Sequence, residues 1–182
     1  MTGERTALAD LLQARSVRHG DFVLASGQRS RYYVDARKTT MSAEGLEVVG
    51  QLGLSAIRML GWKAEAVGGE TLAADPVAYA IAMASRQAPP VLDAFTVRKD
   101  PKKHGTGRQI EGCFEKGMRV VIVEDTITTG GSVTRAAEAV RTAGGTVAGV
   151  LGLVDREEGG VDALRAAGYQ VHVLLSIKDL GL

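Results

Sequence analysis

The sequence is poor in three features that would each point to a particular class of protein. It has one cysteine, Cys113, which excludes an intramolecular disulfide and is typical of a reducing compartment. The formal net charge is +1, with 24% charged residues, so no overall field favours nucleic acid or a membrane surface. No apolar run approaches the ~20 residues that span a bilayer, and residues 1–10 lack the apolar core of a signal peptide. We therefore expect a cytoplasmic protein that binds neither nucleic acid nor membrane.

The pattern of apolar residues predicts one α/β domain. The 182 residues contain no internal repeat, low-complexity tract or long linker, and they are enough to bury a full core. From Trp62 onward, short apolar runs alternate with helical spacing, which predicts βαβ units and a Rossmann-like, mainly parallel sheet flanked by helices. Strands are predicted near residues 65–68, 91–97, 119–124, 147–154 and 169–175, and helices near 76–86, 131–143 and 161–167.

The N-terminal part has a different pattern and predicts a small separate unit, over residues 1–40. Leu8, Leu11 and Leu12 have helical spacing. Strands are then expected over 22–25 and 32–36, on either side of a turn at Ser26–Gly27. Ser42 is a suitable N-cap for the next helix, whose apolar stripe ends at Gly61.

The most informative segment is VVIVEDTITTGGS, residues 120–132. Its short β-branched run is typical of a buried parallel strand, so Glu124 and Asp125 are expected at the strand's carboxyl end, where ligands bind in open α/β sheets. The turn that follows, Thr126 to Ser132, consists mostly of small residues and opens a helix, as phosphate-binding turns do. It has neither the Walker ending nor the dinucleotide spacing. Two carboxylates beside a phosphate turn predict a sugar 5-phosphate, whose hydroxyls the acids would bind. The alternative is an ordinary strand–turn–helix junction with two surface acids.

This segment resembles, without gaps, the phosphoribosyl-pyrophosphate (PRPP) signature of type I phosphoribosyltransferases. The resemblance implies the type I phosphoribosyltransferase fold and PRPP as the sugar donor. It also implies that PRPP is bound by Glu124, Asp125, Thr126, Ile127, Thr128, Thr129, Gly130, Gly131 and Ser132.

A basic segment, RKDPKKHGTGRQIEG at residues 98–112, concentrates positive charge that the rest of the chain lacks. Pro101, Gly105 and Gly107 disfavour regular structure, so we predict a mobile loop that closes over an anionic substrate; the alternative is a solvated surface loop. The segment resembles the catalytic loop of the orotate phosphoribosyltransferase family at Arg98, Lys99, Lys102, His104 and Gly105. The resemblance implies that Lys99, Lys102 and His104 act in catalysis together with Asp125 and, with Arg98, contact PRPP. It further implies a homodimer whose loop residues reach the neighbouring subunit's site.

Further matches point to orotate as the acceptor base. Arg156 occupies the position that pairs with the orotate carboxylate in this family, and a guanidinium is suited to that planar group. Thr128 stands where enzymes for 6-oxopurines usually have Asp. The segment FVLASGQRSRYYVDARK resembles the family's base-binding hood, which implies orotate contacts at Ser26, Gly27, Tyr32 and Tyr33. Otherwise, Arg156 is a surface residue paired with Asp155 or Glu157, and the tyrosines belong to the core.

The implied reaction is Mg²⁺-dependent transfer of 5-phosphoribose from PRPP to orotate, which gives orotidine 5′-monophosphate and pyrophosphate in pyrimidine biosynthesis. Mg²⁺ is expected to be held mainly through PRPP and water, with no direct protein ligand. The chain departs from many family members in having Ala25 and Ala73 where those have Lys, so another group must balance the pyrophosphate charge. Two alternatives are a phosphoribosyltransferase for a purine or uracil, and a non-catalytic PRPP sensor that regulates transcription.

Overall fold

A six-stranded sheet forms the centre of the computed structural model, which describes residues 3–23, 27, 29–100 and 109–182. The strand order is β5-β4-β3-β6-β7-β8. Five strands are parallel: β3 (Ala66–Glu70), β4 (Asp93–Val97), β6 (Arg119–Ile127), β7 (Thr146–Asp155) and β8 (Val171–Ser176). The edge strand β5 (Ile110–Gly112) is antiparallel to β4. The predicted mainly parallel sheet is confirmed.

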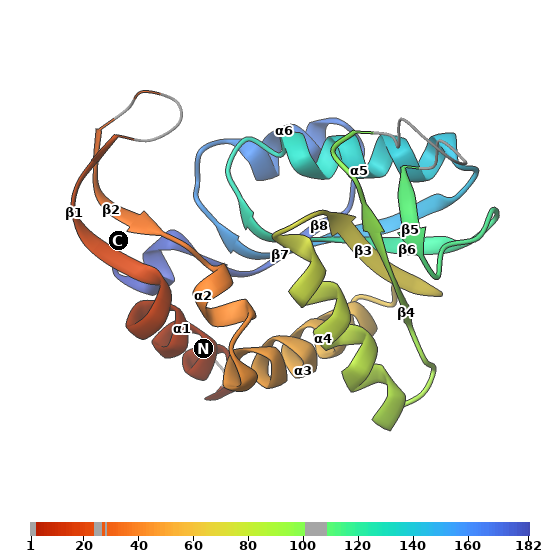
Figure 1. The fold of residues 1–182 in the computed structure, drawn as a ribbon, viewed down its shortest axis with the longest axis horizontal. Coiled ribbons are helices and arrows are strands. Elements are labelled where there is room, and N and C mark those ends of the chain that lie inside the picture. The colour runs from red at the N-terminus through yellow and green to blue at the C-terminus, as the bar shows by residue number, and fades with distance from the viewer. Residues whose placement is uncertain (1–2, 24–26, 28, 101–108) are drawn as a thin grey trace.

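Helices cover both faces of this sheet (Figure 1). On one face lie α3 (Ala43–Met59) and α4 (Ala74–Gln87); on the other lie α5 (Gly131–Thr142) and α6 (Gly160–Ala166). Because successive strand residues point to opposite faces, Val121 and Val123 of β6 enter the core on the α3 and α4 side. Val120 and Ile122 enter the core under α5. Both faces need apolar side chains, which is why this strand is an unbroken apolar run rather than an alternating one.

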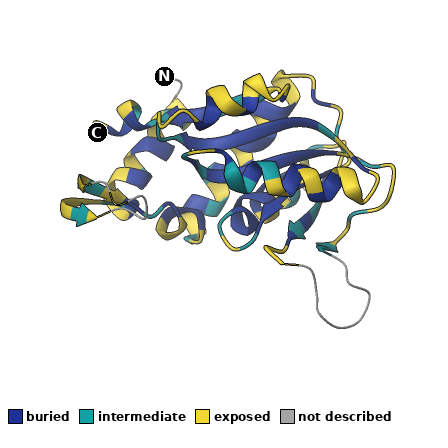
Figure 2. Ribbon diagram, turned by 90° about the horizontal axis from the view of Figure 1, so that it is seen from above, coloured by how far each residue is buried: buried dark blue, intermediate teal, exposed yellow. Residues whose placement is uncertain are grey.

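The N-terminal residues form a hood that projects from the body of the molecule (Figure 1). Helix α1 (Gly3–Ser16) packs Leu8 and Leu12 into the core, and β1 (Val17–Val23) pairs antiparallel with β2 (Arg29–Val34). The predicted hairpin is confirmed, but β1 starts five residues earlier than expected. Its first residues, VRHGD, are almost all exposed (Figure 2), so they carry no apolar alternation that would reveal a strand.

Two short helical segments were not predicted. The single turn α2 (Arg37–Thr40) connects the hood to α3, and its Thr39 side chain hydrogen-bonds Ser16 at 2.7 Å between the hydroxyl oxygens. The 3₁₀ turn η1 (Ile177–Leu180) follows β8. Both are too short for a 3.6-residue period to show in the sequence.

The ends of two predicted segments differ in ways that affect the site. Strand β6 continues to Ile127, because Thr126 and Ile127 still pair with β7, so Glu124 and Asp125 lie within the strand rather than after it. The segment expected to be a loop over 98–112 ends in strand β5. Arg98 and Gln109 close its base: the Arg98 amide donates to the Gln109 carbonyl at 2.9 Å, and Gln109 Nε2 donates to the Arg98 carbonyl at 3.0 Å.

Within the described ranges, no helix is both long and apolar enough to span a membrane.

Candidate active site

Two buried carboxylates from β6 form the floor of the candidate site. Glu124 and Asp125 each expose only 7% of their surface. Although they are neighbours in a strand, their side chains interact with each other, through charge and a side-chain hydrogen bond. Glu124 interacts electrostatically with Glu70 at the end of β3 and with Arg135 of α5, whereas Asp125 interacts with Arg37 and Asp35 at the base of the hood.

Burial raises the pKa of Glu124 to about 8, and the nearby Asp125 and Glu70 carboxylates act in the same direction. Burial also raises the pKa of Asp125, against a hydrogen bond from the Thr126 amide and the charge of Arg37, which lower it. Among the described residues, Glu124 Oε2 is buried and has no hydrogen-bond partner. Buried acids with a raised pKa and an unsatisfied oxygen are typical of a binding site, because ligand hydroxyls can supply the missing donors.

The turn after β6 encloses a small hollow beside these acids. Its cavity of about 30 Å³ is lined by Glu124, Thr126, Ile127, Thr128, Thr129, Gly130, Gly131, Ser132 and Val133. Helix α5 begins here, after Gly130 in the left-handed conformation (φ 81°), and no side chain of the described residues caps its N-terminus. Its first N–H groups are therefore free to bind an anion, which the positive end of the helix dipole also favours.

Arg156 is positioned beside this turn by the backbone. Its amide donates to the Ile127 carbonyl at 2.9 Å, at the end of β6. The side chain is 8% exposed, and its Nη2 lies 3.0 Å from Glu158 Oε1, an ion pair with neither Asp155 nor Glu157. Its guanidinium lies over the Tyr32 ring, 5.5 Å from the centroid. Within the described part of the chain, the buried Nε has no acceptor.

The structure separates the two tyrosines of the hood. Tyr32 faces Arg156, while Tyr33 is on the other face of β2, where its ring packs 5.7 Å from Phe22. Alternation along a strand makes this unavoidable. Gly27 lies in the hairpin bend with a φ of 83°, whereas Ser26 and Ala25 lie outside the described residues.

Only part of the predicted basic loop can be placed. Arg98 and Lys99 are exposed, and Arg98 Nη1 lies 4.0 Å from Glu111. Lys102, His104 and Gly105 lie outside the described residues. Ala73 directly precedes α4.

Two ion pairs at the site were not predicted from the sequence. Arg135 binds the buried Glu70 carboxylate through Nε and Nη2, at 2.7 and 2.9 Å. Arg37 binds Asp35 at 2.8 Å, which lowers the pKa of Asp35 through a direct hydrogen bond. The sequence does carry one signal for the first pair: Glu70 is an acid two residues after the strand predicted near 65–68, which places it at the same sheet edge as Glu124.

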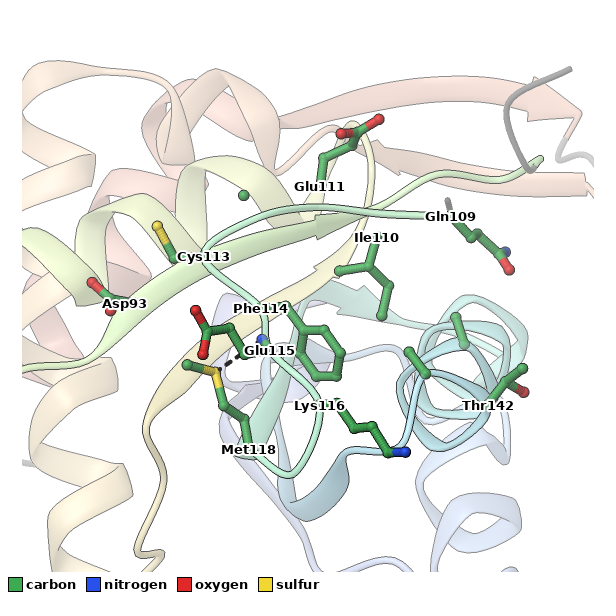
Figure 3. Close-up of a pocket in the computed structure, with 13 residues that line it drawn as sticks. Asp93, Gln109, Ile110, Glu111, Cys113, Phe114, Glu115, Lys116, Met118 and Thr142 are labelled. Carbon is green, nitrogen blue, oxygen red and sulfur yellow. Dashed lines mark hydrogen bonds between the residues drawn. The ribbon is translucent and has the colours of Figure 1, made fainter. Parts of the chain in front are cut away.

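A much larger hollow of about 1050 Å³ lies elsewhere (Figure 3). It is bounded by the segment that contains β5 and by the C-terminal part of α5, with Glu111, Cys113, Phe114 and Thr142 among its lining residues. Its lining shares no residue with the hollow beside Glu124. Size alone therefore does not identify the site in this molecule.

Comparison with known proteins places these features in one family. Residues 96–166 match the model of the phosphoribosyl transferase domain. The orotate phosphoribosyltransferase of Corynebacterium glutamicum (strain R) is 44% identical over 178 residues, which cover 98% of this chain and 94% of that protein. The corresponding enzyme of Aquifex aeolicus (strain VF5) is 42% identical over 180 residues, with 97% of both chains covered.

A solved structure agrees with the sequence relatives. The crystal structure of Mycobacterium tuberculosis H37Rv orotate phosphoribosyltransferase in complex with PRPP matches with a TM-score of 0.84 and 39% identity, and covers 98% of this chain and 99% of that one. The fold is the type I phosphoribosyltransferase fold. With its buried acidic pair, the turn of small residues at the start of α5 and its near full-length relatives, this chain belongs to the orotate phosphoribosyltransferase family.

Proposed function

We propose that this chain transfers 5-phosphoribose from PRPP to N1 of orotate, giving orotidine 5′-monophosphate and pyrophosphate in the synthesis of UMP. The observation that carries this function is the buried pair Glu124–Asp125 leading directly into an uncapped helix N-terminus, with the Arg156 guanidinium beside the same turn. The whole chain acts as one domain, with residues 1–40 as the hood over the base and the segment from residue 98 as the catalytic loop.

PRPP occupies the β6–α5 junction in this proposal. Glu124 and Asp125 accept hydrogen bonds from the ribose hydroxyls, and the turn from Thr126 to Ser132 binds the 5-phosphate through N–H and hydroxyl groups. Support comes from the unsatisfied Glu124 Oε2 and from the small cavity that both the acid and the turn line.

Orotate lies between this junction and the hood. Arg156 binds its carboxylate, Thr128 donates to a ring carbonyl, and Tyr32 covers the ring. Further orotate contacts are proposed at Ser26, Gly27 and Tyr33, as the family resemblance implies, although the Tyr33 ring packs against Phe22. The buried Arg156 Nε, unpartnered within the described chain, supports the carboxylate role, because a buried guanidinium N–H needs an acceptor.

Catalysis follows from placement and charge rather than from a protein nucleophile. As the C1′–O bond breaks, its electron pair leaves with pyrophosphate and the ribose gains oxocarbenium character. N1 of orotate forms the new bond to C1′ and gives up its proton to the departing pyrophosphate or to water. The buried carboxylates Glu124 and Asp125 favour the positive charge on the ribose. Lys99, Lys102 and His104, with Arg98, neutralise or protonate the departing pyrophosphate.

The residues at the site suit Mg²⁺ carried in by the substrate. Within the described part of the chain, no group of three or more His, Cys, Asp or Glu side chains could hold a metal ion. The acids that are present offer oxygen atoms beside the ribose site, which is the donor type that Mg²⁺ accepts. Mg²⁺ bound together with PRPP would offset the pyrophosphate charge, for which Ala73 offers no cation.

The active unit in this proposal is a homodimer, in which each subunit contributes Lys99 and Lys102 to its partner's site. Support comes from α4, which exposes Tyr79 by 53% and Met83 by 71%, next to Leu72 at 59%. This helix packs on β4, the strand that leads into the basic loop. A second copy seated on α4 would therefore lie close to the base of that loop.

The compartment proposed is the cytoplasm. The single cysteine, Cys113, is exposed and unpaired in the chain, as expected of a protein from a reducing compartment.

The function is tested by mixing the purified protein with PRPP and Mg²⁺ and following the ultraviolet absorbance of orotate. Hypoxanthine, adenine and uracil are run in parallel as alternative bases. Metal-dependent loss of orotate alone is the expected result. PRPP binding without turnover of any base would contradict the proposal and favour the sensor alternative.

A further inference from the structure

The turn that is expected to hold the 5-phosphate carries no positive side chain of its own. Its sequence from Thr126 to Ser132 is TITTGGS, and two buried carboxylates precede it. A phosphate monoester carries roughly 1.5 to 2 negative charges at neutral pH. The N-terminus of α5 offsets only about half a charge. A charged side-chain donor beside the turn would therefore strengthen the binding of this end of the substrate.

Arg135, one turn into α5, has its guanidinium directed back toward the start of the helix. A Cβ atom placed on Gly131 would lie 3.3 Å from Arg135 Nη1 and 3.8 Å from Thr129 Oγ1. The guanidinium nitrogen and the threonine hydroxyl thus both border the space that glycine leaves free. Arg135 does not itself line the small cavity, but both Gly131 and Thr129 do.

Glu70 holds the guanidinium in this orientation. Its carboxylate, with a side chain only 4% exposed, accepts from Nε at 2.7 Å and from Nη2 at 2.9 Å. Two parallel bonds fix the plane of the guanidinium, which a lysine ammonium could not do. In the described part of the chain, Nη1 makes no hydrogen bond, and the Arg135 side chain is 52% exposed. A charged donor is therefore fixed in place, open to a ligand and without an acceptor.

We propose that Arg135 binds the 5-phosphate of PRPP through Nη1, and that Glu70 is the positioning residue that holds the guanidinium beside the turn. The buried Glu124 Oε2, unpartnered among the described residues, lines the same hollow and is satisfied by the ribose of the same ligand. The inference rests on the proposed function, because it takes the turn as the site of the 5-phosphate. It adds a side-chain cation to a turn that otherwise offers only neutral donors.

Ribose 5-phosphate is the probe, because it binds the turn without pyrophosphate, orotate or turnover. Its dissociation constant is measured by calorimetry for the wild type, Arg135→Ala and Glu70→Gln, in parallel with that of Mg²⁺-pyrophosphate. Loss of one charge-assisted hydrogen bond predicts a 10- to 100-fold weaker affinity of Arg135→Ala for ribose 5-phosphate, by order of magnitude. Glu70→Gln should give a smaller loss, and the affinity for pyrophosphate should stay unchanged in both. Arg141→Ala, which removes the same charge from the far end of α5, is the matched control.

Several results would overturn the inference. Unchanged ribose 5-phosphate affinity in Arg135→Ala, or a loss confined to pyrophosphate, removes Arg135 from the 5-phosphate. An equal loss of ribose 5-phosphate affinity in Arg141→Ala would show that the effect comes from the net charge of the protein and not from a contact of Arg135. If Arg135→Ala fails to fold, Arg135→Lys is used instead, because it keeps the charge but cannot form the two parallel bonds to Glu70. Wild-type affinity for ribose 5-phosphate in Arg135→Lys would show that the fixed guanidinium is not needed. A wild-type protein that does not bind ribose 5-phosphate would instead overturn the proposed function together with this inference.

Discussion

Glu124 illustrates how a residue's chemistry depends on its surroundings. In the sequence it is an acid near the end of a strand, with an ordinary pKa. In the fold it is 7% exposed, next to Asp125 and facing Glu70, and its pKa is raised to about 8. Such an acid destabilises the ligand-free protein when ionised and becomes satisfied when a polyol binds. If Glu124 binds the ribose of PRPP, as proposed, this cost in stability is linked to the affinity for that ligand.

Because the pKa of Glu124 is about 8 in the folded chain and 4.5 ordinarily, the folded state keeps a proton that the unfolded state loses between these pH values. The free energy of unfolding therefore falls as the pH rises from 4.5 to 8. Glu124→Gln removes this loss, so the variant should match the wild type near pH 4.5 and exceed it above pH 8 by up to about 5 kcal/mol. Urea denaturation of the ligand-free proteins at several pH values measures the difference.

The exposed acid of α5 provides the control for this prediction. Glu138→Gln removes a carboxylate from the outer side of the same helix that covers Glu124, and its effect should not vary with pH. A difference between Glu124→Gln and wild type that is constant from pH 5 to pH 9 would contradict the raised pKa.

Arg156 is predicted to bind the carboxylate of orotate. Arg156→Ala should raise KM for orotate by roughly 10- to 100-fold, the size expected for a lost charge-assisted bidentate contact, and leave KM for PRPP almost unchanged. Steady-state kinetics with each substrate varied in turn provide the measurement. Arg156→Lys, which keeps the charge but not the planar geometry, should recover only part of the loss. Equal increases for both substrates would indicate a structural role through Glu158 and Tyr32.

At the level of elements, the contact between α3 and α4 holds the helix that leads out of the Glu70 strand. Gly50 lies where α3 approaches the α4 backbone: a Cβ there would lie 2.6 Å from the Ala80 carbonyl oxygen. A backbone atom in a helix cannot move aside as a side chain can. The glycine is needed for this close approach rather than for a turn.

Gly50→Ala should therefore destabilise the protein by about 1–3 kcal/mol, in spite of the better helix propensity of alanine. The free energy of unfolding in urea is the measurement. Ser55→Ala, on the exposed side of the same helix, should change it by less than about 0.5 kcal/mol. A stabilised Gly50→Ala protein would mean that the two helices can separate without loss.

The elements that could be predicted are those in which the apolar pattern extends over many residues or in which all residues are buried. The helix capped by Ser42 is confirmed, with the Ser42 hydroxyl accepting from the Gly45 amide at 3.0 Å, and so are the buried parallel strands. Strand β5 could not be predicted from the sequence, since three residues at a sheet edge show no recognisable apolar period. The first half of β1 could not be predicted either, because its residues face solvent and show no apolar alternation.

The whole molecule matters for catalysis if the proposed dimer exchanges its loops. A mixture of Lys102→Ala and Arg156→Ala chains tests this, because in a mixed dimer one site then carries both changes and the other carries neither. With free exchange of subunits, half of the dimers are mixed, so activity should recover to about a quarter of the wild-type value for a twofold-symmetric pair. The assay uses low orotate concentration, where both parent variants are slow.

Each parent protein mixed with itself is the control for this experiment, and light scattering establishes the state of association. A mixture no more active than the parents would contradict contribution of Lys102 from the partner subunit. A monomeric and fully active wild type would contradict the dimer itself.

The sequence by itself determined the class of fold and predicted the kind of ligand. Acids followed by a turn of small residues, after a buried β-branched run, predict a sugar phosphate site at a sheet edge, and the alternating elements identify an α/β sheet. Both conclusions depend on local order along the chain, which the sequence displays directly. Membership of the family follows from the same segments, together with the basic loop and Arg156.

Only the tertiary structure decided which distant side chains share the site. Glu70 and Arg135 are 65 residues apart in the sequence, and they meet because β3 and β6 are neighbours in the sheet and α5 crosses back over both. Tyr32 rather than Tyr33 faces Arg156, because the register of β2 fixes which side chain turns inward. Pairing across a sheet depends on strand order and register, which arise from packing of the whole chain and not from any local segment.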